Sequence, residues 1–139
     1  MKTFLALLLF AFTSITQAQT IIHLNEKTAP DSLENIKVEK LAGDSLVSSF
    51  LIWIKVGIAA HFHVNHSEHV MMLEGEGTLT MNGKHYELKK GDMVFIPKGT
   101  VHSFANTTDV PAKILSIQAP QFDGTDRHFP PSADTPTGY

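Results

Sequence analysis

Three histidines and one glutamate have the residue types and the spacing best suited to a chemical role in this sequence. His61 and His63 stand two residues apart, and Glu68 follows five residues later. His102 lies further along the chain. Three imidazoles and one carboxylate form a ligand set of borderline hardness, which suits Fe(II), Mn(II), Ni(II), Zn(II) or Cu(II). We therefore predict one divalent transition metal at these four side chains, with two octahedral positions left for water or substrate; the order of affinities does not choose among the five metals.

The expected roles of the other histidines depend on their positions relative to these four residues. A His-x-His pair alone is more often a pair of surface residues in a polar turn. The added Glu68 and His102 favour the metal site. His66 is a candidate outer ligand, whereas His69 points away from Glu68 in a strand and is expected at the surface or behind the ligands. No metal role is expected for His23, His85 or His128.

Short β-strands are predicted to position these residues. Residues two apart in a strand point to the same face, so His61 and His63 project together while Phe62 turns away. The segment 46–56 is apolar on both parities, which is typical of a strand covered on both faces. The predicted strands are 36–41, 46–56, 68–73, 77–81, 84–88, 93–96, 101–105 and 112–117. Many short strands without a long amphipathic helix indicate an all-β sandwich or barrel.

Turn residues separate the predicted strands. Asn82-Gly83 lies between two strand patterns and is the strongest short hairpin signal, because both residues tolerate positive φ. Positive φ or close backbone approach is also expected at Gly75, Gly91 and Gly99. Pro97 is expected at a strand end, where its missing N–H costs no ladder hydrogen bond.

Two spaced motifs contain the predicted ligands. The later one has Gly, five residues, Pro-x-Gly, two residues, His, three residues and Asn, at Gly91, Pro97, Gly99, His102 and Asn106. The earlier one ends in His-x-His, Glu and Gly, at His61, His63, Glu68 and Gly75. Together they resemble the second and first motifs of the cupin superfamily, and the chain resembles a small single-domain member. Gly57 departs from the pattern, because it stands closer to His61 than the motif places its first glycine.

This resemblance implies a double-stranded β-helix, or jelly-roll barrel, with the metal inside one mouth. It also implies a homodimer, for which Thr20–Leu24 is a candidate exchanged strand; within one chain the same segment is predicted as an edge strand or an arm. The expected divisions are an arm over 19–35, a barrel over 36–120, and a lid or exposed tail over 121–139.

The pocket wall is predicted from strand parity. Val70 and Met72 share the parity of Glu68, and Phe104 shares that of His102, so these three are the candidates for the wall. Ordinary barrel core is the alternative for all three. Trp53 suits either a pocket or a core position.

The first 18 residues have the pattern of a secretory signal peptide. A short charged start, an apolar run from Phe4 to Phe12 and small residues before Gln19 predict cleavage after Ala18 and a periplasmic or secreted protein. An uncleaved anchor is the alternative, but the run is short for a bilayer. Removing Lys2 changes the formal net charge from −3 to −4, and no basic stripe suits nucleic acid or an anionic membrane.

The predicted function is that of a metal-dependent enzyme acting on a small organic molecule. Within the range implied by the resemblance, dioxygenase-like chemistry is favoured, because an iron or manganese site with open positions binds both dioxygen and a chelating substrate. The alternatives are a non-catalytic module that binds a small molecule or sugar, and a purely structural metal. No nucleophile motif or phosphate-binding loop is present in the sequence.

Overall fold

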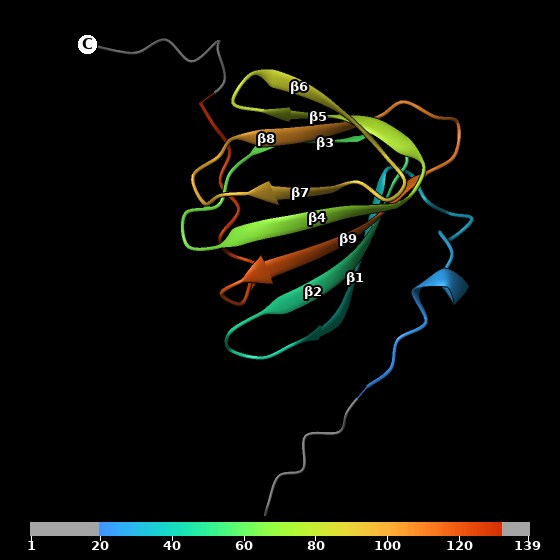
Figure 1. Ribbon diagram of the computed structural model, residues 1–139, viewed down its shortest axis with the longest axis horizontal. Coiled ribbons are helices and arrows are strands. Elements are labelled where there is room, and N and C mark those ends of the chain that lie inside the picture. The colour runs from blue at the N-terminus through green and yellow to red at the C-terminus, as the bar shows by residue number, and fades with distance from the viewer. Residues whose placement is uncertain (1–19, 132–139) are drawn as a thin grey trace, which may run out of the picture.

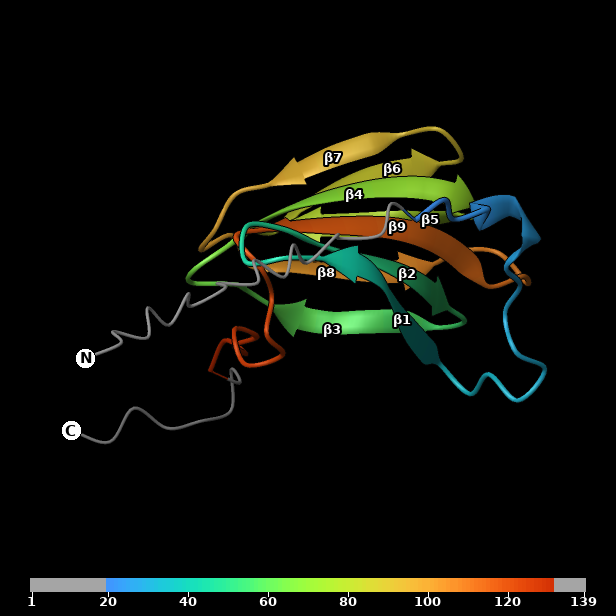
Figure 2. The ribbon, with the colours of Figure 1, turned by 90° about the horizontal axis from the view of Figure 1, so that it is seen from below.

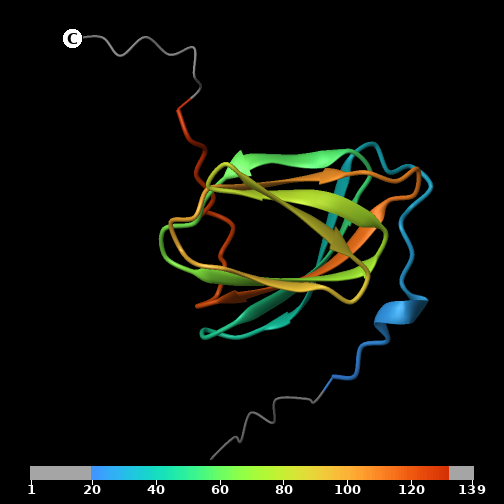
Figure 3. The ribbon, with the colours of Figure 1, turned by 45° about the horizontal axis from the view of Figure 1, so that its top comes forward.

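A computed structural model describes residues 20–131, which form two β-sheets facing one another (Figures 1 and 3). A short 3-10 helix, η1 (Leu24–Glu26), precedes the strands. The strands are β1 (Ile36–Gly43), β2 (Ser48–Ile54), β3 (Gly57–His61), β4 (Ser67–Glu74), β5 (Glu76–Met81), β6 (Lys84–Lys89), β7 (Met93–Ile96), β8 (His102–Asn106) and β9 (Ala112–Ala119). Each predicted strand is present, with ends that differ by one or two residues.

One sheet has the order β1-β2-β9-β4-β7 and the other β3-β8-β5-β6. Every pairing within them is antiparallel. From β2 onward the chain passes repeatedly between the two sheets, and the five-stranded sheet is nearest the viewer in Figure 2. The predicted all-β jelly-roll barrel is confirmed.

The main core lies between the sheets. It consists of apolar side chains that point inward from both sheets: Ile54, Val70, Met72, Leu79, Leu88, Ile96, Phe104, Ala112 and Ile114. Burial alternates along β4, where Glu68, Val70 and Met72 are buried and His69 is exposed. Period-2 patterning therefore predicted the inward face of this strand correctly.

A second, smaller core covers the outer face of the five-stranded sheet. Leu51 and Trp53 point outward from β2 and pack with Leu33. Leu24 and Ala29 of the N-terminal segment also lie against this cluster. Trp53 is thus a core residue on the outside of the barrel. Strand β2 is covered on both faces, as predicted for the middle of segment 46–56, whereas Leu46 and Val56 at its ends are exposed.

The prediction of an edge strand at Thr20–Leu24 is wrong for the single chain. These residues form no strand, and η1 begins at Leu24. The alternating pattern is explained by Leu24, which packs on the outer core without a backbone ladder. Just after η1, an ion pair between Lys27 Nζ and Glu39 Oε1 at 2.6 Å ties the N-terminal part of the chain to β1.

The predicted turns have the expected backbone. Asn82 and Gly83 join β5 to β6 with φ of 46° and 77°, the signs required by a tight hairpin turn. Gly75, Gly91 and Gly99 have φ of 80°, 94° and 79°. Pro97 directly follows β7, as predicted.

The predicted signal peptide, residues 1–18, and the end of the predicted tail, residues 132–139, lie outside the described residues. Within residues 20–131, no helix has the length and apolar character needed to cross a membrane.

Candidate metal centre

A bulge in β3 places two of the predicted ligands opposite one another. Between Ile58 and His61 the register of β3 against β8 shifts by one residue, and His61 then pairs directly with His102. Directly paired residues of antiparallel strands have neighbouring side chains on one face. The two imidazole centroids are accordingly 4.2 Å apart. His63 follows just beyond the strand, with its ring centroid 5.0 Å from that of His61.

The three imidazoles share a hydrogen-bonding arrangement that leaves one nitrogen of each available. Nδ1 of His61 donates to the carbonyl of Ala59 at 2.9 Å, and Nδ1 of His102 donates to that of Thr100 at 2.9 Å. Nδ1 of His63 donates to the carbonyl of Asp126. A carbonyl oxygen can only accept, so each Nδ1 carries the proton and each Nε2 keeps its lone pair.

The Nε2 atoms of this set lack protein partners where a metal would supply one. Nε2 of His63 and of His102 is buried without a hydrogen bond among the described residues. One nitrogen from each of His61, His63 and His102 lies within 4.8 Å of the others. Buried polar atoms without a partner are rare in folded proteins. These three residues could therefore hold a metal ion, and their donor set fits one.

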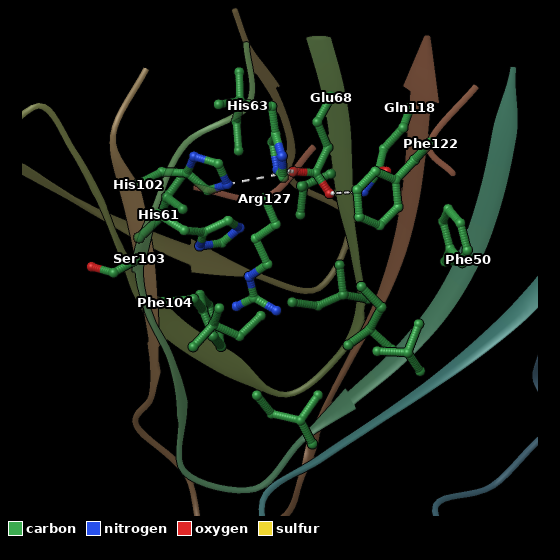
Figure 4. Close-up of a pocket in the computed structure, with 18 of the residues that line it drawn as sticks. Phe50, His61, His63, Glu68, His102, Ser103, Phe104, Gln118, Phe122 and Arg127 are labelled. Atoms are coloured by element: carbon green, nitrogen blue, oxygen red, sulfur yellow. Dashed lines mark hydrogen bonds and ion pairs between the residues drawn. The ribbon is translucent and has the colours of Figure 1, made fainter. Parts of the chain in front are cut away.

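Glu68 lies beside the three histidines, as Figure 4 shows. Its Oε2 is 3.5 Å from Nε2 of His102 and 3.7 Å from Nε2 of His63. Its Oε1 accepts hydrogen bonds from Ser116 Oγ and, at 3.2 Å, from Gln118 Nε2. The two donors on β9 thus hold one oxygen and leave the other facing the imidazoles. The structure brings the four predicted ligands together.

The electrostatics of the set favour neutral His61 and ionised Glu68. Burial, followed by the charge of His102, lowers the pKa of His61 to about 4. Burial acts to raise the pKa of Glu68, but the neighbouring imidazoles of His102 and His63 and the hydrogen bond from Ser116 outweigh it and hold that pKa well below its usual range. Burial acts to lower the pKa of His63, yet Glu68 and the Asp126 carbonyl raise it on balance.

Asp126 fastens the C-terminal segment to the loop that carries His63. Its carboxylate accepts the backbone N–H of Val64 at 2.9 Å and of Asn65 at 2.8 Å. It also contacts Nδ1 of His66 at 2.8 Å. Burial opposes the charge of this carboxyl, but the two backbone N–H donors and His66 lower its pKa to about 2. Asp126 is a positioning residue that strand periodicity could not find, because it lies in a loop.

The histidines outside the set have different surroundings. His66 is buried, and its ring centroid is 4.1 Å from that of His63, beside the predicted ligands. His63, His66 and Asp126 form a second group of close potential ligand atoms. His69 is exposed next to Phe95. The exposed His85 contacts Thr80, and His128 contacts Asp126.

An apolar cavity opens beside the three imidazoles. Val70 and Phe104, two of the candidates for the pocket wall, are among its lining residues. Met72 is not among its lining residues; it shares the inward face of β4 but is 1% exposed in the main core. Parity predicted the direction of Met72 correctly, but the cavity does not extend to its depth. The other apolar lining residues are Ile36, Val38, Phe50, Ile52, Ile58, Leu79, Leu88, Ile96, Ile114 and Phe122.

The C-terminal segment contributes Phe122 and Arg127 to the cavity wall. The ring of Phe122 lies 6.1 Å from that of Phe50 and 6.0 Å from that of His63. A backbone bridge between Phe62 and His128 holds the segment against the loop after β3. The described part of segment 121–139 therefore lies along the mouth of the cavity.

Replacing Asp126 with alanine should weaken metal binding by roughly 10–100-fold, the usual effect of losing a group that orients a metal ligand. The expected cause is loss of the ties to Val64 and Asn65, which hold the Asp126 carbonyl against His63. Competition titration with a coloured zinc chelator measures the affinity. Asp123→Ala is the matched control, because Asp123 bonds only to Thr125 in its own loop. Equal affinities for the two variants would show that Asp126 orients nothing.

Metal affinity should fall as the pH is lowered, because an imidazole must be neutral to ligate. Because the pKa of His63 is raised above the usual value of 6.5, the first loss should begin at a higher pH than for an ordinary histidine, at about tenfold per pH unit where one proton is displaced. The pKa of His61, about 4, places a second loss in acid. The same competition titration between pH 8 and pH 4 measures both steps. An affinity that stays constant from pH 8 to pH 5 would contradict this assignment.

Comparison with known proteins agrees with the fold. The family model described as "Cupin domain" matches residues 54–118. An uncharacterized protein of Aquifex aeolicus is 39% identical over 100 residues, which are 72% of this chain and 82% of that protein. A Klebsiella pneumoniae protein with a double-stranded β-helix domain has a solved structure with a TM-score of 0.65 and 22% identity, covering 74% of this chain and 91% of that chain.

Named enzymes are similar over shorter stretches. Quercetin 2,3-dioxygenase of Bacillus subtilis is 38% identical over 47 residues, which are 34% of this chain and 14% of the enzyme. A mannose-1-phosphate guanylyltransferase of Klebsiella pneumoniae is 36% identical over 77 residues, which are 54% of this chain and 16% of the enzyme. This chain therefore corresponds to a small part of each enzyme.

Proposed function

The chain belongs to the cupin family, and we propose that it is a metal-dependent enzyme that acts on a small organic molecule. Oxygen-dependent cleavage is the reaction that we propose for it. The observation that carries the proposal is the position of the three imidazoles, each with one ring nitrogen within 4.8 Å of those of the others at the wall of an apolar cavity. His61, His63 and His102 would hold the metal, and Glu68 stands close enough to join them.

A bound iron or manganese ion would supply Lewis acidity and the redox capacity needed for oxygen-dependent cleavage. The chain's own contributions are positional. The backbone carbonyls at Nδ1 fix the three imidazole tautomers, and Ser116 and Gln118 orient Glu68. The apolar wall excludes water around a substrate and strengthens electrostatic interactions inside the cavity.

The composition of the cavity wall favours an apolar or aromatic substrate over a sugar. Apart from Glu68 and the three histidines, its polar lining residues are Ser103, Gln118 and Arg127. A sugar presents many hydroxyl groups, and each would need a partner once buried. The similarity to a quercetin dioxygenase agrees with an aromatic substrate, whereas the similarity to mannose-1-phosphate guanylyltransferases reaches only a small part of those enzymes.

Oxygen uptake tests the proposal. The protein, loaded with Fe(II) or Mn(II) without air, is mixed with oxygenated solutions of phenolic, diketone and thiol compounds. Uptake above that of a His61→Ala/His63→Ala variant, with a cleaved product, is the expected result. Compounds that bind but are recovered unchanged, without uptake above the control, would contradict the enzyme and indicate a binding module instead.

We propose in addition that the protein is exported to the periplasm or secreted, after cleavage before Gln19. The pattern of the first 18 residues supports this. Mass spectrometry of the protein from its natural source tests it: a mature chain that begins at Gln19 and occurs outside the cytoplasm is expected, and an intact N-terminus in the cytoplasm would contradict it.

Finally, we propose a homodimer formed through the outer face of β7, β4 and β9. Support comes from Met93, Phe95 and Ile117, whose apolar side chains are exposed on that face. Light scattering after size-exclusion chromatography should give a molar mass twice that of one chain. The Phe95→Lys variant should instead have the molar mass of the monomer. A monomer at every concentration would reject the proposal.

A further inference from the structure

Arg127 is the one cationic side chain among the described residues that line the cavity. It comes from the C-terminal segment rather than from a strand. The residue as a whole is exposed at the mouth of the cavity, and its guanidinium lies on the cavity side next to His61 and Phe104 (Figure 4). The cavity wall below it is largely apolar.

The hydrogen-bonding capacity of the Arg127 side chain is not used within residues 20–131. No hydrogen bond or ion pair of its guanidinium is formed there, and its described contact is with the ring of Phe129, 5.5 Å from Cζ. The neighbouring Asp126 is already engaged by Val64, Asn65 and His66. Burial lowers the pKa of Arg127 while Glu68 opposes this effect. Five N–H donors therefore remain for a ligand.

The position of Arg127 is fixed by the residue before it. Asp126 is tied to the loop after β3 through its carboxylate and through its carbonyl, which accepts from His63. The backbone N–H of Arg127 also donates to Thr125 at 2.9 Å. These bonds set the guanidinium and the three imidazoles on the same cavity, so that one small molecule can reach both.

We propose that Arg127 binds a carboxylate of the substrate, so that the substrate is a small aromatic or other apolar carboxylic acid. The planar guanidinium pairs with a carboxylate through two parallel hydrogen bonds, a geometry that a lysine cannot offer. The apolar wall then surrounds the body of the acid, and its far side faces His61, His63 and His102. This inference rests on the proposed function for the identity of the ligand as a substrate.

A measurement of ligand binding, which does not depend on turnover, tests the proposed role of Arg127. Calorimetry with the Zn(II)-loaded protein compares cinnamate with cinnamamide, which has the same shape without the charge. Hydrogen bonds to a charged group contribute about 1.5–3 kcal/mol, so the acid should bind roughly 10–100-fold more tightly than the amide. Arg127→Met should remove this preference and leave amide binding unchanged. Arg127→Lys should retain only part of it.

Two controls show whether the preference for the acid comes from Arg127, from the metal, or from any positive charge near the cavity. Lys98→Met removes an exposed positive charge from the Pro97–Gly99 turn at the same end of the barrel and should leave the preference unchanged. The preference should persist in the metal-free protein; if it disappears there, the metal binds the carboxylate and the inference is wrong. Equal binding of acid and amide, or an Arg127→Met variant that keeps the preference, would overturn it as well.

Further outcomes distinguish this inference from the proposed function. Phenyl phosphate that binds more tightly than cinnamate would overturn the carboxylate assignment in favour of a phosphate ester. Acid-selective binding through Arg127 without any oxygen uptake would sustain the role of Arg127 and contradict the enzyme. Oxygen-dependent cleavage of an acid and its amide at equal rates, with the rate on the acid unchanged in Arg127→Met, would sustain the enzyme and contradict the role of Arg127.

Discussion

Replacing His63 with alanine is expected to lower metal affinity by more than about 100-fold. Loss of a residue that merely orients a ligand costs roughly 10–100-fold, and removal of the ligand itself should cost more. His63 has a further role, because it joins the three-histidine set to Asp126 and to the mouth of the cavity. His102→Ala should have a similar effect, since its Nε2 is likewise buried without a protein partner among the described residues.

Competition titration with a chelator measures the affinities, and His69→Ala is the matched control. His69 lies on β4 next to Glu68 but is exposed on the opposite face. Its removal should leave metal affinity within twofold of the unchanged protein, a bound set by the usual small effect of surface substitutions. If His63→Ala and His69→Ala bound metal equally well, the three-histidine centre would be wrong. Circular dichroism establishes that each variant is folded.

Met72→Ala is expected to destabilise the protein by about 2–5 kcal/mol, the usual cost of truncating a large buried side chain to alanine. Met72 is 1% exposed and packs in the main core behind the site. The variant leaves a cavity among side chains from both sheets. Because that core holds β4 against the opposite sheet, the effect should be large although Met72 does not line the cavity.

Urea unfolding measures this loss, and Met93→Ala provides the comparison. Met93 is a methionine on the adjacent strand β7 but is 63% exposed. Its truncation should change the free energy of unfolding by no more than about 0.5 kcal/mol in a monomer. Equal destabilisation by the two substitutions would contradict the assignment of Met72 to the core. A dimer through this face would add a concentration-dependent effect to Met93→Ala alone.

Local signals explain why much of the fold could be predicted. Hairpin geometry at Asn82-Gly83 requires only two residues that tolerate positive φ, so the sequence carries it directly. Strand parity likewise predicts the face to which His61, His63 and Glu68 point. Parity does not predict how far along the inward face the cavity extends. It therefore predicts Met72 on the pocket wall, although Met72 is not among the residues that line the cavity.

Long-range partners could not be predicted from the same signals. Ser116 and Gln118 reach Glu68 only because β9 pairs with β4 in a particular register, and that register depends on the whole barrel. The parity of Ile114 was the one available signal that Ser116 faces inward. Asp126 and Arg127 lie in an irregular segment without periodicity, so their contact with the site depends on the tertiary fold.

Thr20–Leu24 shows the limit of alternation as a signal. A strand needs a neighbour that satisfies its backbone, and alternation in one segment does not reveal whether a neighbour exists. In the single chain, Leu24 instead packs on the outer core. Exchange of this segment with a second subunit stays a prediction.

Elemental analysis of the protein, purified from its natural source without added metal, shows whether the three histidines hold a metal ion. We expect close to one iron or manganese per chain, and none in a His61→Ala/His63→Ala variant prepared in the same way. A folded protein that carries no transition metal, or a metal content unchanged by the double substitution, would contradict the claim that these histidines form a metal centre.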